Sequence, residues 1–223
     1  TSISDDAFEG CSSLTSVTIP DSVTSIGNRA FEFCSSLTDV TILGPIKIIN
    51  YNMFSRCKKL TSVTIPNSVK NIGFQAFFQC SSLTSIVIPD SVKKIGESAF
   101  VSCSNLTSIT IPDSVTSIGN SAFSYCSSLK SVTISDSVTS IGKRAFRDCC
   151  NLTNAFIPDS VISIGDWAFE NCNLSSVIIP KAVRKVGQGS FHGCKEITVY
   201  DSIDPDTSPC KSHPYACNGT LNS

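Results

Sequence analysis

The sequence has few of the side chains on which most enzyme active sites depend. Among 223 residues there are two histidines, one tryptophan and one methionine, and charged residues make up only 16% of the chain. Neither His192 nor His213 has a serine or cysteine partner in a recognisable nucleophile motif. The Cys-x-x-Cys spacing and the paired histidines typical of zinc sites are also missing. We therefore expect no catalytic residue, no metal site and no cofactor, and predict that the protein is not an enzyme.

A strong charge of either sign is missing as well. The formal net charge is −1 and the isoelectric point is near 6.1, which gives no electrostatic reason to expect nucleic acid or an anionic membrane as a partner. No run approaches the ~20 apolar residues that a membrane-spanning helix needs. No basic segment followed by an apolar one opens the chain, as a secretory signal would. We therefore expect neither nucleic-acid binding nor membrane insertion.

The chain contains one 23-residue unit repeated about eight times, most clearly from Leu106 to Ser128. Phenylalanine marks the unit at Phe8, Phe31, Phe54, Phe77, Phe100, Phe123, Phe146, Phe169 and, after a one-residue deletion, Phe191. Cysteine follows at Cys11, Cys34, Cys57, Cys80, Cys103, Cys126, Cys149, Cys172 and Cys194. A fixed period of roughly 20 to 50 residues indicates a solenoid, in which each unit buries its apolar side against its neighbours. We predict a solenoid over residues 1–200, with an incomplete first unit, and an irregular C-terminal tail over residues 201–223.

Each unit reads as a strand, a turn and a helical turn. The phrase Leu-x-x-Val-x-Ile, as in residues 14–19, alternates apolar and hydroxyl residues and ends at a proline, which is typical of a short strand. Stacked copies predict a parallel sheet. The Ile-Gly sequence that follows predicts a glycine with positive φ. In the second unit Asn50 takes the place of this glycine, and asparagine also tolerates positive φ. Ala-Phe-x-x-Cys then predicts a single α or 3₁₀ turn on the outer face.

The combined pattern Leu-x-x-Ile-x-Ile-Pro-x-x-Val-x-x-Ile-Gly-x-x-Ala-Phe-x-x-Cys resembles the BspA-type leucine-rich repeat, a class found in surface proteins of bacteria and protists. The resemblance implies an α/β repeat solenoid, curved and right-handed, with one short parallel strand per unit on the concave face and short helical turns on the convex face. It also implies an extracellular or cell-surface location and a role in protein binding and adhesion. Expected partners are matrix proteins, host proteins or further copies of the chain, and glycans are a further expected class.

The cysteines divide into two groups. Equivalent residues of stacked units lie about 5 Å apart with parallel Cβ bonds, which does not fit a disulfide, so the nine repeating cysteines are predicted to be small, inert core residues. Cys150, Cys210 and Cys217 stand outside this series. Cys210 and Cys217 are spaced for a disulfide that closes a small loop at the C-terminal cap. Cys150 is predicted to be exposed, and is either free or joined to a partner chain.

The residues that flank the central apolar residue of each strand are predicted to point outward on the concave face. They are Ser16, Thr18, Asp39, Thr41, Ser62, Thr64, Ser85, Val87, Ser108, Thr110, Ser131, Thr133, Asn154, Phe156, Ser176 and Ile178. Most are small hydroxyl residues, which suit any strand surface. Phe156 and Ile178 break the pattern. They are either unremarkable strand residues or a contact patch, since adjacent exposed apolar side chains are uncommon without a partner.

Four Asn-x-Ser/Thr sequences are candidate N-glycosylation sites, at Asn105, Asn151, Asn173 and Asn218. Three of them fall just before a predicted strand, so attached glycans would line one edge of the solenoid. Glycosylation depends on a eukaryotic secretory origin. Trp167 falls at a variable position and is predicted to be partly exposed on the convex face.

Two functions remain open from the sequence. The first is a non-catalytic extracellular or cell-surface protein that binds other proteins through an extended face. The alternative is a structural subunit that assembles end to end into a filament, with or without glycans, because solenoid ends without polar caps can join head to tail. The identity of the partner and the source organism cannot be read from the repeat.

Overall fold

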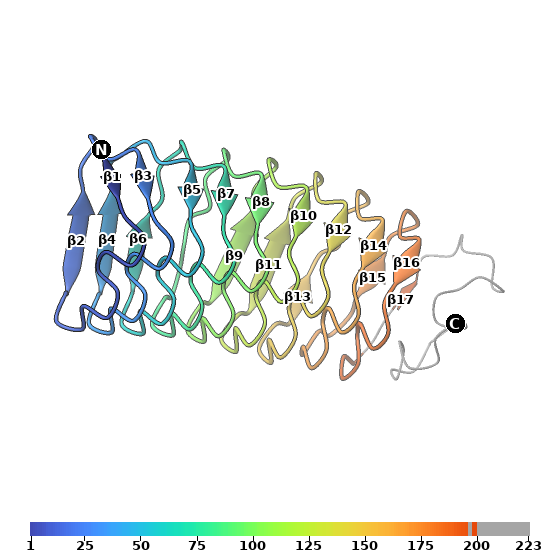
Figure 1. The fold of residues 1–223 in the computed structure, drawn as a ribbon. Helices are drawn as coiled ribbons and strands as arrows, with labels where there is room; N and C mark the ends of the chain where they lie inside the picture. Colours follow the sequence, from blue (N-terminus) through green and yellow to red (C-terminus); the bar gives the residue numbers. More distant parts are fainter. Residues whose placement is uncertain (196–197, 200–223) are drawn as a thin grey trace.

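The computed structural model describes residues 1–195 and 198–199, which form one stack of coils (Figure 1). Each coil corresponds to one repeat unit, and successive coils follow one another in sequence order along the stack. A coil has three sides, two of which carry short parallel strands and the third of which is built from turns. The stacked architecture and the parallel strands every 23 residues confirm the predicted repeat solenoid. The prediction of one strand per unit is wrong, because most coils carry two.

The first strand column forms the side predicted to be concave. It contains β2 (Ser16–Ile19), β4 (Asp39–Ile42), β6 (Ser62–Thr64), β9 (Ser108–Ile111), β11 (Ser131–Ile134), β13 (Asn154–Ala155), β15 (Ile178–Ile179) and β17 (Thr198–Val199). These strands pair in three separate sheets, β2-β4-β6, β9-β11-β13 and β15-β17. The column is therefore interrupted at residues 85–88, which form no strand, and again between β13 and β15.

The second strand column is more continuous. It contains β1 (Ser2–Ile3), β3 (Ser25–Ile26), β5 (Ile48–Ile49), β7 (Asn71–Ile72), β8 (Lys94–Ile95), β10 (Ser117–Ile118), β12 (Ser140–Ile141), β14 (Ser163–Ile164) and β16 (Lys185–Val186). Seven of these strands, from β5 to β16, form one sheet. Ser117 pairs with Ser140, which places equivalent residues of consecutive coils side by side.

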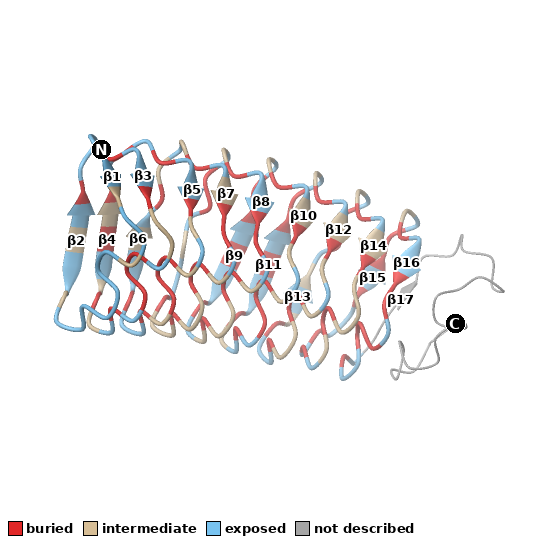
Figure 2. Cartoon of the chain, in the orientation of Figure 1, coloured by how far each residue is buried: buried red, intermediate tan, exposed pale blue. Residues whose placement is uncertain are grey.

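The interior of the stack is apolar, as the repeat predicts. Phenylalanine rings of consecutive coils stack with centroids 5.1–5.6 Å apart and interplanar angles of 2–19°. Alternating strand residues are buried inside and exposed outside, so buried and exposed segments recur along every coil (Figure 2). Burial of these rings and of the strand residues is the main source of stability.

The third side consists of turns, and the structure assigns no helix to residues 1–195 and 198–199. The predicted helical turn at Ala-Phe-x-x-Cys is therefore not found. The Cys34 amide donates to the Phe31 carbonyl at 3.3 Å, closing a four-residue turn, and Phe33 within that turn has φ of 61°. This positive φ prevents the segment from continuing as a helix. The Phe31 amide donates instead to Met53 in the next coil at 3.0 Å.

The prediction of positive φ at the Ile-Gly glycines is wrong. Positive φ occurs two residues before and two residues after each stacked phenylalanine, as at Arg29 and Phe33 around Phe31. The glycine is needed because the coils approach closely at this point. A Cβ on Gly119 would lie 2.7 Å from the carbonyl carbon and oxygen of Gly96, which is closer than real Cβ atoms approach other atoms.

Candidate interaction surface

The outward side chains of the first strand column form one side of the stack, here called the strand face. Fifteen of its sixteen predicted positions are exposed and Thr41 is half-buried. The strand face therefore has the composition that the sequence predicts, mostly serine and threonine hydroxyls. Its two interruptions are the only apolar features on it among residues 1–195, and both coincide with a break in strand pairing.

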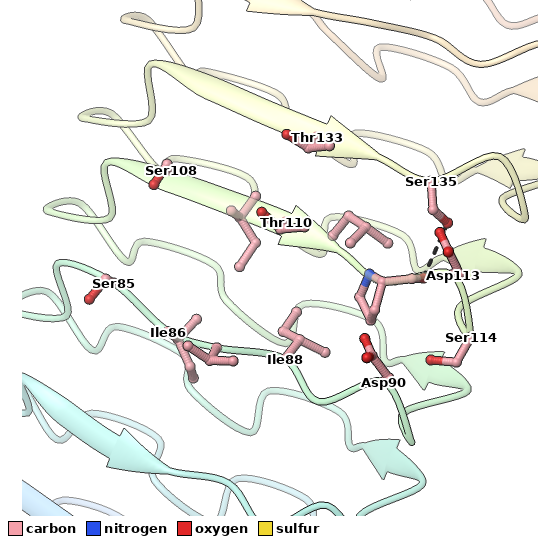
Figure 3. Close-up of a pocket in the computed structure, with 14 residues that line it drawn as sticks. Ser85, Ile86, Ile88, Asp90, Ser108, Thr110, Asp113, Ser114, Thr133 and Ser135 are labelled. Atoms are coloured by element: carbon pink, nitrogen blue, oxygen red, sulfur yellow. Dashed lines mark hydrogen bonds between the residues drawn. The ribbon is translucent and has the colours of Figure 1, made fainter.

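The first interruption, here called the Val87 groove, lies between residues 85–88 and strand β9. It has a volume of about 890 Å³ and is lined by residues 85–88, 90, 108–114, 133 and 135. Figure 3 shows Ser85, Ile86 and Ile88 along one side of the groove, and Ser108 and Thr110 along the other. Beyond them, the Ser135 hydroxyl donates to the Pro112 carbonyl at 3.2 Å. Val87 is 80% exposed.

Strand pairing is lost in the coil that carries Val87, although its sequence is that of a regular strand. The Thr107 amide donates to Thr84 at 3.1 Å, but beyond this point the structure shows no backbone bond for residues 85–88. Lys94 and Ile95 of the same coil pair normally with β7, and Ile95 pairs with β10. The coil is therefore held on its other sides and opens only at the strand face.

The second interruption, here called the Phe156 groove, lies between β13 and β15. It has a volume of about 520 Å³ and is lined by Phe156, Ile157, Asp159, Ile178, Pro180, Lys181 and Ala182. Phe156 is 67% exposed and Ile178 is 46% exposed. The break in pairing coincides with the one-residue deletion between Cys172 and Leu174, which shortens this coil directly before its strand. The two side chains predicted as a contact patch therefore line one groove.

The repeating cysteines lie in the core as predicted, apart from Cys11, which is exposed. Each buried thiol donates to the carbonyl of a phenylalanine in the preceding coil, as Cys126 does to Phe100 at 3.2 Å. Burial raises the pKa of Cys34 to about 11 and that of Cys194 to about 12. All cysteines in the described part of the chain are free, and Cys150 is exposed as predicted.

The other predicted site residues are scattered. Asn105, Asn151 and Asn173 are exposed, and the Asn151 side-chain amide donates to the Ser127 carbonyl at 2.7 Å. Trp167 is half-buried, with Lys143 Nζ 4.8 Å and the Arg144 guanidinium 5.1 Å from its ring centroid. Cys210, Cys217, Asn218 and the whole predicted tail, residues 201–223, lie outside the described residues. Glycosylation and the Cys210–Cys217 disulfide stay predictions.

Exposed aromatic side chains on the turn side were not identified from the sequence. Tyr51 and Phe74 occupy one repeat position in consecutive coils, and Arg56 lies between Phe33 and Phe78, with its guanidinium 4.8 and 5.7 Å from their ring centroids. The sequence did contain a signal for them. Other units carry a polar residue three positions before the stacked phenylalanine, whereas two consecutive units carry Tyr51 and Phe74 there.

The described residues give no evidence for a metal site or for a membrane-spanning helix. Across residues 1–195 and 198–199 no three His, Cys, Asp or Glu side chains come together in a group that could hold a metal ion. The same residues include no helix long and apolar enough to cross a membrane. His192 is exposed on the turn side.

The comparisons with known proteins agree with this geometry. The family model described as the BspA type leucine rich repeat region matches residues 1–130 and 70–198. A leucine-rich repeat protein from Bacteroides ovatus has a similar crystal structure, with a TM-score of 0.84, 35% identity, and coverage of 89% of this chain and 52% of that one. The chain thus spans about half the length of that relative. A search of curated proteins finds no match.

Two further crystal structures share the architecture at lower similarity. The Treponema pallidum leucine-rich repeat protein has a TM-score of 0.56 and 28% identity, with 99% of this chain and 78% of that chain covered. The pneumococcal vaccine antigen PcpA has a TM-score of 0.58 and 25% identity, with 89% and 53% covered. All three solved structures thus come from bacteria.

Proposed function

Because the chain belongs to the BspA-type leucine-rich repeat family, we propose that it is a non-catalytic extracellular or cell-surface protein that binds other proteins through its strand face. Family membership supports the proposed location, since the BspA-type leucine-rich repeat is a class found in surface proteins of bacteria and protists. Adhesion to matrix proteins, host proteins or other cells is the role proposed for this binding.

The observation that carries the proposal is the exposure of Phe156 and Ile178 in one groove. A soluble surface made otherwise of small hydroxyls gains nothing in water from a large phenylalanine that is 67% exposed. An aromatic ring in a groove is the kind of side chain that contributes most to protein–protein affinity. The Phe156 groove therefore provides an apolar centre for an interface.

The surroundings of this groove suit a protein partner. Asp159 and Lys181 stand at its edge and carry opposite charges. The strand face beyond it presents serine and threonine hydroxyls, which can donate and accept hydrogen bonds. An apolar centre surrounded by polar groups is the usual anatomy of a protein interface. The Val87 groove supplies a second apolar point on the same face.

A non-catalytic role is supported by family membership, because BspA-type leucine-rich repeat proteins are generally non-catalytic. The side-chain chemistry is consistent with this role. The buried thiols have raised pKa values, so they are poor nucleophiles. The segment around Ser190 superficially resembles a nucleophile loop. The Ser190 hydroxyl is buried, however, and donates a hydrogen bond to the Gly187 carbonyl at 2.6 Å.

The proposal is tested by placing charges in the groove. A variant with Phe156→Asp and Ile178→Asp should lose at least tenfold in affinity for whichever of a panel of purified matrix proteins or whole cells the wild-type protein binds. A variant with Thr18→Asp and Thr41→Asp adds the same charges to the same column at the other end and should bind normally. Equal binding by all three proteins would exclude the Phe156 groove as the contact site.

The alternative function, end-to-end assembly into a filament, stays a prediction. Sedimentation over a range of concentrations separates the two functions, because a binding module should stay monomeric. Long particles with an axial repeat of one chain length, seen by electron microscopy, would favour the filament.

A further inference from the structure

A second concave site lies on the turn side, away from the strand face. It has a volume of about 310 Å³, at the lower end of the range of roughly 300–1,000 Å³ for small-molecule sites. Six residues from four consecutive coils line this site, here called the aromatic pocket: Asp5, Asn28, Arg29, Tyr51, Asn52 and Phe74. It shares no residue with either groove of the strand face.

The backbone under the aromatic pocket is fixed by hydrogen bonds between coils. The Asp6 amide donates to Asn28 at 2.9 Å and the Arg29 amide donates to Tyr51, also at 2.9 Å. The Asn52 amide donates to Phe74 at 3.0 Å. The backbone that carries the lining side chains is therefore fixed, and a ligand would not have to order it, which favours binding.

Two aromatic rings form the apolar wall. Tyr51 is 60% exposed and Phe74 is 40% exposed, and their rings meet edge to face with centroids 6.4 Å apart. The Tyr51 ring lies over Gly73, where an added Cβ would come within 3.0 Å of the ring carbon Cδ1. Other coils carry polar side chains at this repeat position, such as Glu97 and Asn120. Among the described residues, Tyr51 and Phe74 are thus the only aromatic pair at this repeat position in consecutive coils.

The remaining wall is polar, and within the described part of the chain the Asp5 carboxylate is its one charge without an ionic partner. The Asp5 carboxylate accepts hydrogen bonds from the Asn28 backbone amide at 2.7 Å and from its side chain at 3.5 Å. Arg29 pairs with Asp6 at 2.8 Å, so its charge is already compensated. The Asn52 side-chain oxygen is shielded from solvent and has no hydrogen-bond partner. A small rotation of this amide would let it accept a hydrogen bond from a ligand.

We propose that the aromatic pocket binds a neutral pyranose sugar. A pyranose presents C–H groups on one face, which pack against an aromatic ring, and hydroxyls around its edge, which both donate and accept hydrogen bonds. The pocket offers these two kinds of surface side by side. A phosphate or carboxylate ligand would be repelled by Asp5, and Arg29 is not free to bind it because it pairs with Asp6. The chemistry therefore favours a polyhydroxylated ligand that offers hydroxyls to the Asp5 carboxylate and C–H groups to the rings.

The site is independent of the protein-binding surface proposed above. A glycan on a cell surface or in a matrix could contact the turn side while a protein contacts the strand face. Phe156→Asp should therefore leave sugar binding unchanged, and loss of Tyr51 should leave protein binding unchanged. The two proposals can fail separately.

Saturation-transfer difference NMR tests the proposal with the methyl glycosides of glucose, galactose, mannose and N-acetylglucosamine as probes. We expect saturation of the ring C–H protons of at least one glycoside, and at least a tenfold weaker affinity for it in Tyr51→Ala. Tyr125→Ala removes an exposed tyrosine elsewhere on the turn side and should bind as the wild type does. Circular dichroism checks that both variants keep the fold.

Two results would overturn the proposal. One is the absence of saturation transfer to all four glycosides. The other is equal affinity in Tyr51→Ala and the wild-type protein, which would place any sugar binding elsewhere. Phe74→Ala gives an independent check, since its ring forms the second half of the apolar wall and its loss should also weaken binding.

Discussion

The Sγ atom of Cys126 donates a hydrogen bond to the carbonyl oxygen of Phe100, 3.2 Å away in the preceding coil. The same bond recurs along the stack, for example from Cys103 to Phe77 at 3.2 Å. Each cysteine thus fills space in the core and links two coils by a hydrogen bond. A thiol suits this position because it is small and apolar and can still donate a weak hydrogen bond. The repeating cysteines are structural, and their protonation state is coupled to folding.

This coupling predicts that the solenoid loses stability in alkali. Burial raises the pKa of the Cys103 and Cys126 thiols well above their ordinary value, whereas in the unfolded chain a thiol ionises near pH 8.5. Between these pH values the unfolded chain releases protons that the folded chain keeps. The stabilisation is complete below about pH 8.5 and falls by roughly 1.4 kcal/mol per pH unit for each buried thiol above it. Denaturant unfolding at pH 7, 8.5 and 10 measures the slope.

A variant with Cys103→Ala and Cys126→Ala serves as the control for the alkaline effect. It should be less stable at pH 7, because it lacks two packed side chains, and its stability should fall less steeply above pH 8.5. Tyrosine and lysine titrate in the same range but are present in both proteins, so they cancel in the difference of slopes. Identical slopes would show that the thiols are not responsible.

Truncation of one stacked ring should destabilise the whole array. Phe123 is fully buried, with Phe100 at 5.1 Å on one side and Phe146 at 5.4 Å on the other. Phe123→Ala removes both contacts and leaves a cavity, which costs about 3–5 kcal/mol of unfolding free energy. Tyr125→Ala, two residues away and exposed, should change it by less than about 0.5 kcal/mol. Thermal or urea unfolding compares the two variants, and a small effect of Phe123→Ala would mean that the rings contribute little.

Close approach of the coils predicts that Gly119 cannot be replaced. Gly119→Ala places a Cβ 2.7 Å from the backbone of Gly96, so the two coils must move apart, at a cost of about 1–3 kcal/mol. Thr116→Ala, in the same coil on an exposed position, is the matched control and should be nearly neutral. If positive φ were the reason for glycine instead, Gly119→Asn would be tolerated better than Gly119→Ala. We expect Gly119→Asn to be the worse of the two, because asparagine is larger.

The sequence predicted the columns of this fold because each column is a fixed position of the repeat. Phe123 and Cys126 are buried and Phe156 and Ile178 are exposed, as their positions require. The predicted reason for the Ile-Gly glycines, positive φ, was wrong, because the sequence of one unit does not show how closely two coils approach each other. Asn50 strengthened the wrong explanation, although it is tolerated for another reason, since its side chain donates to the Ile26 carbonyl at 2.5 Å.

The candidate sites were harder to predict than the fold. Residues 85–88 have a regular strand sequence, so nothing in it indicates that the sheet opens there. The one-residue deletion after Cys172 was visible, but its effect on pairing between β13 and β15 depends on the neighbouring coil. Positive φ at Arg29 and Trp167 was missed because these residue types rarely adopt it, and the ladder between coils imposes it.

Photo-crosslinking from the strand face tests most directly whether a protein partner binds there. p-Benzoylphenylalanine introduced in place of Ile178 lies in the Phe156 groove, and the same residue in place of Tyr125 lies on the turn side. On illumination with cells or matrix proteins that the wild-type protein binds, we predict one covalent protein adduct from position 178 and none from position 125. Adducts from position 125 alone would contradict binding through the strand face.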